Sequence, residues 1–153
     1  MSRGMRCVRG VISGLLLVAA VSGPALAQRG TLTGTMSGRR MSPTSDTVML
    51  HIDLRMTPGW HVGAVEPGKI GVPTELTWQF PAGWRVVASH WSPPTATVVG
   101  RDTVLEYRAP FSISSILVTG QANHSGAIKA VIAYGICRDV CVPGRLTLTD
   151  EVR

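Results

Sequence analysis

The chain has 153 residues, with 15 basic and 9 acidic side chains and a formal charge of +6. This length suits one domain and excludes a multidomain enzyme. An apolar content of 44% with only 16% charged residues excludes an intrinsically disordered chain. The basic excess on its own would fit a nucleic-acid-binding protein, so where the charge lies along the chain has to be considered first.

The first 27 residues have the pattern of a secretory signal peptide. Three arginines and no acidic residue precede the apolar stretch 11–21, and Ala25-Leu26-Ala27 has the small-residue pattern of a signal-peptidase site. This apolar stretch is too short to span about 30 Å of hydrocarbon, which takes about 20 helical residues. We therefore expect residues 1–27 to direct export and to be removed by cleavage after Ala27.

Cleavage after Ala27 changes the composition of the protein. Removing 27 of the 153 residues leaves 126, with 12 basic and 9 acidic side chains and a charge of +3. Cys7 is removed with the signal, so the mature chain keeps two of the three cysteines, Cys137 and Cys141. An even cysteine count in an exported chain fits an oxidising compartment. The main argument for nucleic-acid binding disappears, and we expect no nucleic-acid partner.

The mature chain reads as a flexible arm followed by short strands. Residues 28–46 are rich in Gly, Ser, Thr and Arg, which predicts a flexible arm before a domain at 47–153. From Thr47 to Met56, apolar and polar residues alternate, which predicts a half-buried strand. Further extended segments are predicted at 60–62, 74–80, 84–88, 102–108, 113–119, 127–136 and 145–149. Turns rich in Gly and Pro separate them, so we predict an all-β sandwich of about seven to nine strands.

The two remaining cysteines lie close together in the sequence. Four residues of extended strand would hold their Cα atoms about 13 Å apart, whereas a disulfide needs roughly 4.4–6.8 Å. If the cysteines pair, the chain must turn back between them, with Cys137 ending one strand and Cys141 beginning the next. Such a small ring contributes only about 2 kcal/mol in the loop-entropy model, less than a longer loop would. An exposed ring at a hairpin tip is also easier to reduce, which favours a redox role.

The spacing of the cysteines alone leaves three interpretations open: a redox pair, a structural disulfide and a metal site. Arg138 beside Cys137 would favour a thiolate, and Asp139 would oppose it. Two thiolates with a histidine or methionine would suit Cu(I), which prefers soft ligands. None of the four histidines has a partner at zinc-finger or helical spacing. These histidines are His51, His61, His90 and His124.

No other pattern in the sequence points to an enzyme site. No Ser/His/Asp set, carboxylate pair or phosphate-binding loop is recognisable, so a hydrolase function has no local support. We expect no resident cofactor or metal and no small-molecule substrate. The tryptophans are most simply aromatics of the core and edges of a sandwich.

The cysteine segment resembles the hairpin of a known family. The family is the N-terminal periplasmic domain of the thiol:disulfide interchange protein DsbD, also called the disulfide bond corrector family. Within the hairpin the matching residues are Tyr134, Cys137, Cys141 and Pro143. Upstream matches are Pro58-Gly59-Trp60-His61, Gly71-Val72-Pro73-Thr74, Phe80-Pro81-Ala82-Gly83-Trp84 and Tyr107. Together they cover about residues 47–151.

The resemblance implies an immunoglobulin-like sandwich in which Cys137 and Cys141 cycle between disulfide and dithiol. In the family, a membrane-embedded domain reduces this pair, which then reduces periplasmic disulfide isomerases or the thioredoxin-like proteins of cytochrome c maturation. The resemblance therefore implies a periplasmic thiol–disulfide oxidoreductase of the protein-disulfide-reductase type. It also favours Cys141 as the residue that forms the mixed disulfide with a partner.

The resemblance also implies a cap loop over the disulfide. By chain order its counterpart lies near 90–99, with Trp91 as the covering aromatic, although Trp91 fits an ordinary edge aromatic equally well. Tyr134 and Pro143 are expected to support the hairpin.

Two features depart from the family pattern. The C-x3-C spacing is tighter than in the full-length transporter. We also expect this chain to lack a membrane electron carrier of its own, so that its electrons come from another polypeptide. Related domains occur in copper-stress systems. The alternative functions are therefore copper binding, or a non-catalytic immunoglobulin-like binding module with a structural disulfide.

Overall fold

The computed structural model describes residues 30–153. The predicted signal peptide at 1–27 and its cleavage after Ala27 lie outside the described residues. The described part is built from strands, and it contains no helix that could cross a membrane.

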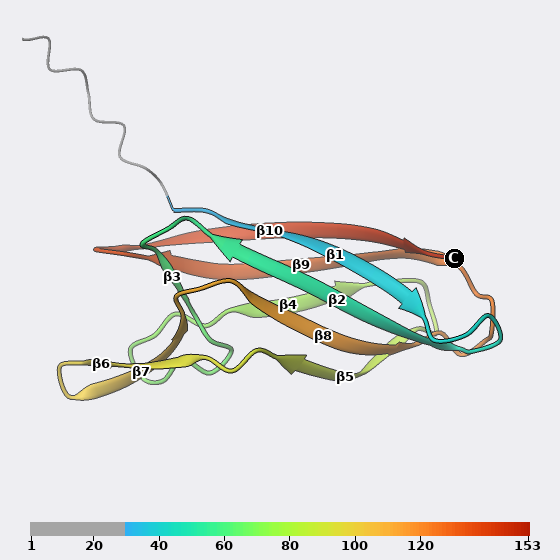
Figure 1. Cartoon of the computed structure of the whole chain (residues 1–153), viewed down its shortest axis with the longest axis horizontal. Helices are drawn as coiled ribbons and strands as arrows, with labels where there is room; N and C mark the ends of the chain where they lie inside the picture. The colour runs from blue at the N-terminus through green and yellow to red at the C-terminus, as the bar shows by residue number, and fades with distance from the viewer. Residues whose placement is uncertain (1–29) are drawn as a thin grey trace, which may run out of the picture.

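Ten strands form two antiparallel sheets that lie face to face (Figure 1). The first sheet has four strands in the order β1-β2-β8-β5, and the second has the order β10-β9-β3-β7-β6, with β4 also paired to β9. The strands are β1 (Leu32–Arg40), β2 (Thr47–Met56), β3 (His61–Gly63), β4 (Glu75–Gln79), β5 (Arg85–Trp91), β6 (Thr95–Val99), β7 (Asp102–Tyr107), β8 (Phe111–Val118), β9 (Gly126–Cys137) and β10 (Cys141–Val152). The predicted all-β class is confirmed, and the fold is an immunoglobulin-like sandwich.

The core lies between the two sheets and follows from the alternation along the strands. In β2, every second side chain from Val48 to Leu54 is at most 2% exposed. In β9, the same period buries Ile128, Ala130 and Ile132 completely. Successive side chains of a strand point to opposite faces, so each sheet offers one apolar face, and burial of these two faces stabilises the sandwich.

The structure corrects the prediction of a flexible arm at 28–46. Residues 32–40 form β1, which pairs with β2 from Leu32 opposite Met56 to Arg40 opposite Val48. The alternation of β1 is hard to see in the sequence because two of its inward positions are glycine. A Cβ atom at Gly34 would lie 2.6 Å from a backbone oxygen of β2, so this position has no room for an apolar side chain that would reveal the strand.

The structure also differs from the predicted strands at two other places. The segment Thr95–Val99 forms β6, which was not predicted because it has no buried face and Val98 is 74% exposed. β10 begins at Cys141, four residues before the predicted strand at 145–149. Pro143 argues against a strand at this point in the sequence, because proline lacks a backbone N–H. β10 is an edge strand, however, where the missing N–H is tolerated.

β9 holds the cysteine hairpin in place. One edge of β9 pairs with β10 along twelve residue pairs, and its other edge pairs with β4 and then with β3. The tip of the β9–β10 hairpin lies at the end of the sandwich opposite the C-terminus (Figure 1). The cysteines are therefore carried at one end of the sandwich by a strand that is paired on both sides.

Candidate functional site

A disulfide joins the last residue of β9, Cys137, to the first residue of β10, Cys141. The two residues are directly opposite each other in the strand register, and their Cα atoms are 4.0 Å apart. Arg138, Asp139 and Val140 form the turn, in which the Arg138 N–H donates to the Val140 carbonyl oxygen at 3.3 Å. The structure thus has the turn between the cysteines that a disulfide requires.

The two cysteines differ in their access to solvent. Cys137 is only 7% exposed, and its Sγ lies 3.9 Å from the carbonyl oxygen of Gly135. Cys141 is exposed. Thiol–disulfide exchange requires the incoming sulfur to reach the sulfur it attacks. A partner protein can therefore reach Cys141, whereas Cys137 is shielded.

A cavity of about 360 Å³ adjoins the disulfide. Both cysteines line it, together with the hairpin turn and residues of β3, β6 and β7. Four exposed apolar side chains also contribute: Ile70, Val72, Val99 and Val140, which we call the apolar rim. Their exposed fractions range from 40% to 68%. Exposed apolar side chains gathered around one site are typical of interaction surfaces.

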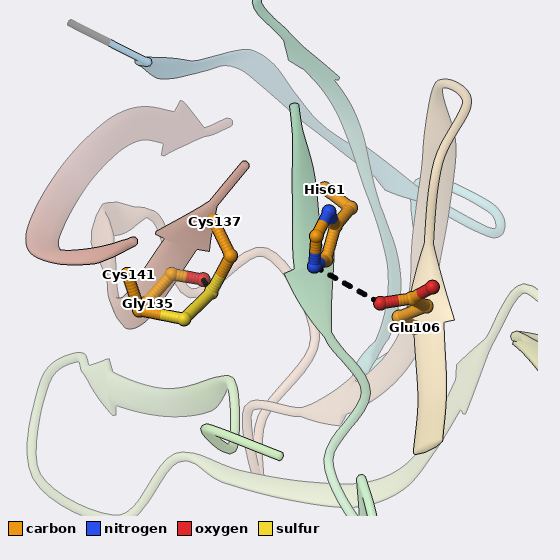
Figure 2. The surroundings of a disulfide bond; sticks show 5 residues. All are labelled: His61, Glu106, Gly135, Cys137 and Cys141. Carbon is orange, nitrogen blue, oxygen red and sulfur yellow. Dashed lines mark hydrogen bonds and ion pairs between the residues drawn. A yellow bond between two sulfur atoms is a disulfide. The ribbon is translucent and has the colours of Figure 1, made fainter. Parts of the chain in front are cut away.

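A buried carboxylate lies in the same cavity. Glu106 of β7 is 2% exposed, and its two oxygens have different partners. Oε1 accepts a hydrogen bond from Arg108 Nε at 2.6 Å, and Oε2 lies 3.1 Å from His61 Nε2. Figure 2 shows His61 between the disulfide and Glu106. These two partners compensate the cost of burying the carboxylate, which would be high if it were unpaired.

The sequence matches a family model over residues 34–152, and the family is described as "Thiol:disulfide interchange protein DsbD, N-terminal". The chain belongs to this family. Its cysteine hairpin and its family make it a domain of the thiol–disulfide exchange type. The predicted resemblance to the DsbD N-terminal family is confirmed. A comparison with proteins of curated function found no match to the sequence.

Solved structures support the fold. The N-terminal periplasmic domain of ScsB from Proteus mirabilis is 19% identical, with a TM-score of 0.55, and the match covers 80% of this chain and 46% of that chain. This chain thus spans less than half the length of that ScsB structure. The reduced DsbD N-terminal domain of Neisseria meningitidis is 10% identical, with a TM-score of 0.45 and coverages of 72% and 78%. The GAE domain of GGA2p from Saccharomyces cerevisiae is 9% identical, with a TM-score of 0.47 and coverages of 80% and 89%. The last two similarities are too weak to add to the argument.

The family resemblance implies that a loop at 90–99 covers the disulfide of this DsbD N-terminal domain. Of this segment, only its last residue lies at the disulfide cavity. Val99 lines the cavity, but Trp91 does not. Trp91 instead stacks on Phe111 with ring centroids 6.5 Å apart, and Phe111 stacks on Tyr107 at 3.8 Å. This aromatic stack belongs to the core, where burial also raises the pKa of the Tyr107 hydroxyl. Trp91 lies on β5, an outer strand of the four-stranded sheet, and packs partly buried against the core.

The segment 64–74, which we call the cover segment, lies over the sheet beside the disulfide. The Thr74 hydroxyl donates to the Gly63 carbonyl at 2.6 Å, and the Leu105 N–H donates to the Pro67 carbonyl at 2.9 Å. Val72 packs so closely on Gly135 that a Cβ atom there would lie 2.6 Å from a Val72 methyl group. Because Ile70 and Val72 line the cavity, the cover segment takes the place that the sequence analysis gave to residues 90–99.

Tyr134 and Pro143 lie on the hairpin, outside the disulfide cavity. The Tyr134 hydroxyl accepts a hydrogen bond from the Leu32 N–H at 3.3 Å, which ties β1 to β9. Its ring lies on Gly144, where a side chain would collide with it. Pro143 is exposed opposite Gly135 on the edge strand, where it removes one backbone donor. Neither residue lines the disulfide cavity.

Arg138, which the sequence places beside Cys137, makes contacts with Asp139 and Trp60. Its Nε donates to the Asp139 carboxylate at 3.0 Å, and its guanidinium carbon lies 5.0 Å from the centroid of the Trp60 ring. The cation–π contact holds the hairpin turn against a tryptophan that is only 7% exposed. Arg138 therefore anchors the turn, while its charge is balanced by Asp139.

Sequence reasoning missed His61 and Glu106 as site residues, because β3 and β7 bring them together from distant parts of the chain. One feature of the sequence could have pointed to Glu106. Glu106 shares a strand face with the buried Val104, and a carboxylate on a buried face needs partners. Among residues 30–153, no group of three or more His, Cys, Asp or Glu side chains is arranged to hold a metal ion.

The structure also brings together a Ser/His/Asp set that is not recognisable in the sequence. On the four-stranded sheet, His51 Nδ1 lies 3.1 Å from Ser114 Oγ, and its Nε2 lies 3.3 Å from Asp53 Oδ1. The side chains of His51 and Asp53 are 48% and 59% exposed. Water competes for these groups, and a catalytic triad needs a shielded site with donors for the oxyanion. This set is therefore a surface hydrogen-bond group.

Proposed function

We propose that this protein is a periplasmic electron-relay domain that reduces thioredoxin-like partner proteins through Cys137 and Cys141. The observation that carries the proposal is the asymmetric disulfide at the hairpin tip, which joins one exposed and one buried cysteine. The export pattern at 1–27 and the periplasmic origin of the ScsB domain support the location. Membership of the DsbD N-terminal family supports the chemistry.

The exposed and the buried cysteine suit different steps of the exchange. The thiolate of Cys141 attacks a sulfur of the partner disulfide, and the second partner sulfur leaves as a thiolate that takes up a proton. Cys137 then attacks Cys141, which restores the internal disulfide and releases the partner dithiol. Two electrons and two protons pass to the partner. A membrane-embedded electron donor returns Cys137 and Cys141 to the dithiol form.

The apolar rim favours a protein as the partner. Ile70, Val72, Val99 and Val140 come from three separate elements and surround the approach to the disulfide. A docked protein would bury these side chains, whereas a small polar thiol could not. Burial of apolar surface stabilises association, so the rim supplies both affinity and orientation.

The experiment that tests this function is a pair of measurements on the mature protein. Equilibration with glutathione should give a reduction potential well above about −300 mV, the level below which structural disulfides lie. The reduced protein should also transfer electrons to an oxidised, purified thioredoxin-fold protein within minutes. A potential below that level, together with no transfer, would establish a binding module with a structural disulfide instead.

Replacing Val140 with aspartate should slow electron transfer to the thioredoxin-fold protein about tenfold, which corresponds to about 1.4 kcal/mol of lost association or transition-state energy. Transfer would slow because docking of the partner would bury the charge of the new aspartate side chain. Val98→Asp is the matched control, because Val98 is also a highly exposed valine but does not line the cavity. Stopped-flow tryptophan fluorescence can follow the transfer. Equal rates for both variants would show that the apolar rim is not the docking surface.

A further inference from the structure

The exchange steps above leave the buried His61–Glu106 pair without a role. We propose that His61, oriented by Glu106, accepts the proton of the Cys137 thiol during exchange and returns it to the departing partner thiolate. This inference rests on the proposed function, since it assigns a proton path to the same site.

The strand register places His61 next to the disulfide. His61 of β3 lies directly opposite Cys137 of β9, and Cys137 lies directly opposite Cys141 of β10. Directly opposite residues of antiparallel strands have side chains on the same face, with Cβ atoms about 4.5–5.5 Å apart. Val62 and Ile136 are buried in the core, so the alternate residues His61 and Cys137 lie on the outer face. The three side chains therefore form one row across the sheet.

Glu106 sets the orientation of the imidazole. Its Oε2 lies 3.1 Å from His61 Nε2, while its Oε1 is held by Arg108. A carboxylate only accepts hydrogen bonds, so Nε2 carries the hydrogen of the neutral ring and Nδ1 is the nitrogen that accepts a proton. Such carboxylate–histidine contacts fix the tautomer and stabilise the imidazolium once it forms. The pair thus has the arrangement of a general base and the carboxylate that orients it.

Cys137 is the sulfur that needs a base. Its 7% exposure limits transfer of the thiol proton to water, and burial disfavours the thiolate. Cys141, in contrast, is exposed and can lose its proton to solvent. A base positioned at Cys137 therefore assists the step in which the internal disulfide forms.

The other charged groups around His61 occur in pairs. Glu106 of β7 and Arg108, which follows β7, line the cavity with His61, and so do Arg138 and Asp139 of the hairpin turn. Each of these carboxylates is bonded to its neighbouring guanidinium. Histidine is the side chain whose charge ordinarily changes between pH 5 and 8. Cys137 and Cys141 are further titratable groups of the cavity when they are reduced.

The step balances in atoms and charge. Nδ1 of His61 takes the proton from the Cys137 thiol as the Cys137 sulfur bonds to the Cys141 sulfur. The bond between Cys141 and the partner sulfur breaks, and the partner leaves as a thiolate. The imidazolium then gives its proton to that thiolate. His61 ends in its starting form, and the partner has gained the two electrons.

The test follows alkylation of Cys137 alone, in a Cys141→Ser background, with iodoacetamide between pH 5 and 9. His61→Gln should lower the rate at pH 7 about tenfold and move the profile to higher pH, because the thiol loses its proton acceptor. Glu106→Gln keeps the shape of the carboxylate without its charge, and it should shift the profile in the same direction by less. His90→Gln, on the exposed side of β5, is the matched control and should leave the profile unchanged. Urea unfolding of each variant verifies the fold.

Two results separate this inference from the proposed function. If the wild-type protein reduces a thioredoxin-fold partner but His61→Gln has the wild-type alkylation profile, the role of His61 is overturned and the relay function stands. If His61→Gln shifts the profile but the wild-type protein transfers no electrons, the proton contact is real and the relay function is wrong.

Discussion

Replacing Cys137 with serine should leave the protein trapped in a mixed disulfide with a thioredoxin-fold partner, whereas replacing Cys141 with serine should trap almost none. The difference follows from exposure, because Cys141 is accessible and Cys137 is 7% exposed. With Cys137 absent, no second thiol resolves the bond to the partner. With Cys141 absent, the remaining thiol cannot reach a partner disulfide.

The trapped species can be counted by non-reducing electrophoresis and by mass spectrometry of the intact complex. The double variant Cys137→Ser with Cys141→Ser is the control for partner dimers and should give no complex. More complex with Cys141→Ser than with Cys137→Ser would mean that Cys137, and not Cys141, attacks the partner disulfide. Equal trapping by both single variants would mean that exposure does not select the attacking sulfur.

The second large effect concerns a backbone position beside the site. Gly63→Ala should lower the free energy of unfolding by about 3 kcal/mol, the upper end of the usual cost of overpacking. A Cβ atom at Gly63 would overlap the Val72 carbonyl oxygen, and Gly63 also accepts the hydrogen bond of Thr74. The backbone of the cover segment would have to move to make room for the methyl group.

Gly100→Ala provides the comparison, because the same methyl group would meet no atom within 4 Å there. Its cost should be about 1 kcal/mol and should come only from the positive φ of 64°. Urea unfolding of the oxidised proteins measures both values. Equal losses in the two variants would show that the cover segment moves aside at little cost in free energy of unfolding.

The parts of the fold that local patterns determine could be predicted from the sequence. β2 and β9 show clear alternation because their inward positions carry large apolar side chains, such as Ile52 and Ile132. β1 could not be predicted, because close packing requires glycine at positions where an apolar residue would have signalled a strand. The cysteine hairpin could be predicted because its geometry depends on only five residues.

The remainder of the candidate site depends on contacts between distant segments. His61 and Glu106 meet only because β3 pairs with β7, and no short pattern encodes that pairing. The family resemblance placed the cap by chain order, but order does not determine which loop lies over a neighbouring strand. Trp91 joined the aromatic stack with Phe111 instead, and Ile70 and Val72 took the position beside the disulfide.

The long pairing between β9 and β10 bears on how a partner distinguishes the two redox states. Twelve residue pairs continue from the cysteines to Val152 opposite Gly126, and these backbone contacts do not depend on the sulfur–sulfur bond. We therefore expect the hairpin and the surface around it to keep nearly the same shape when that bond is reduced. In the proposed relay, a partner would then dock on both forms with similar affinity. The relative reduction potentials of the docked proteins would set the direction of electron flow.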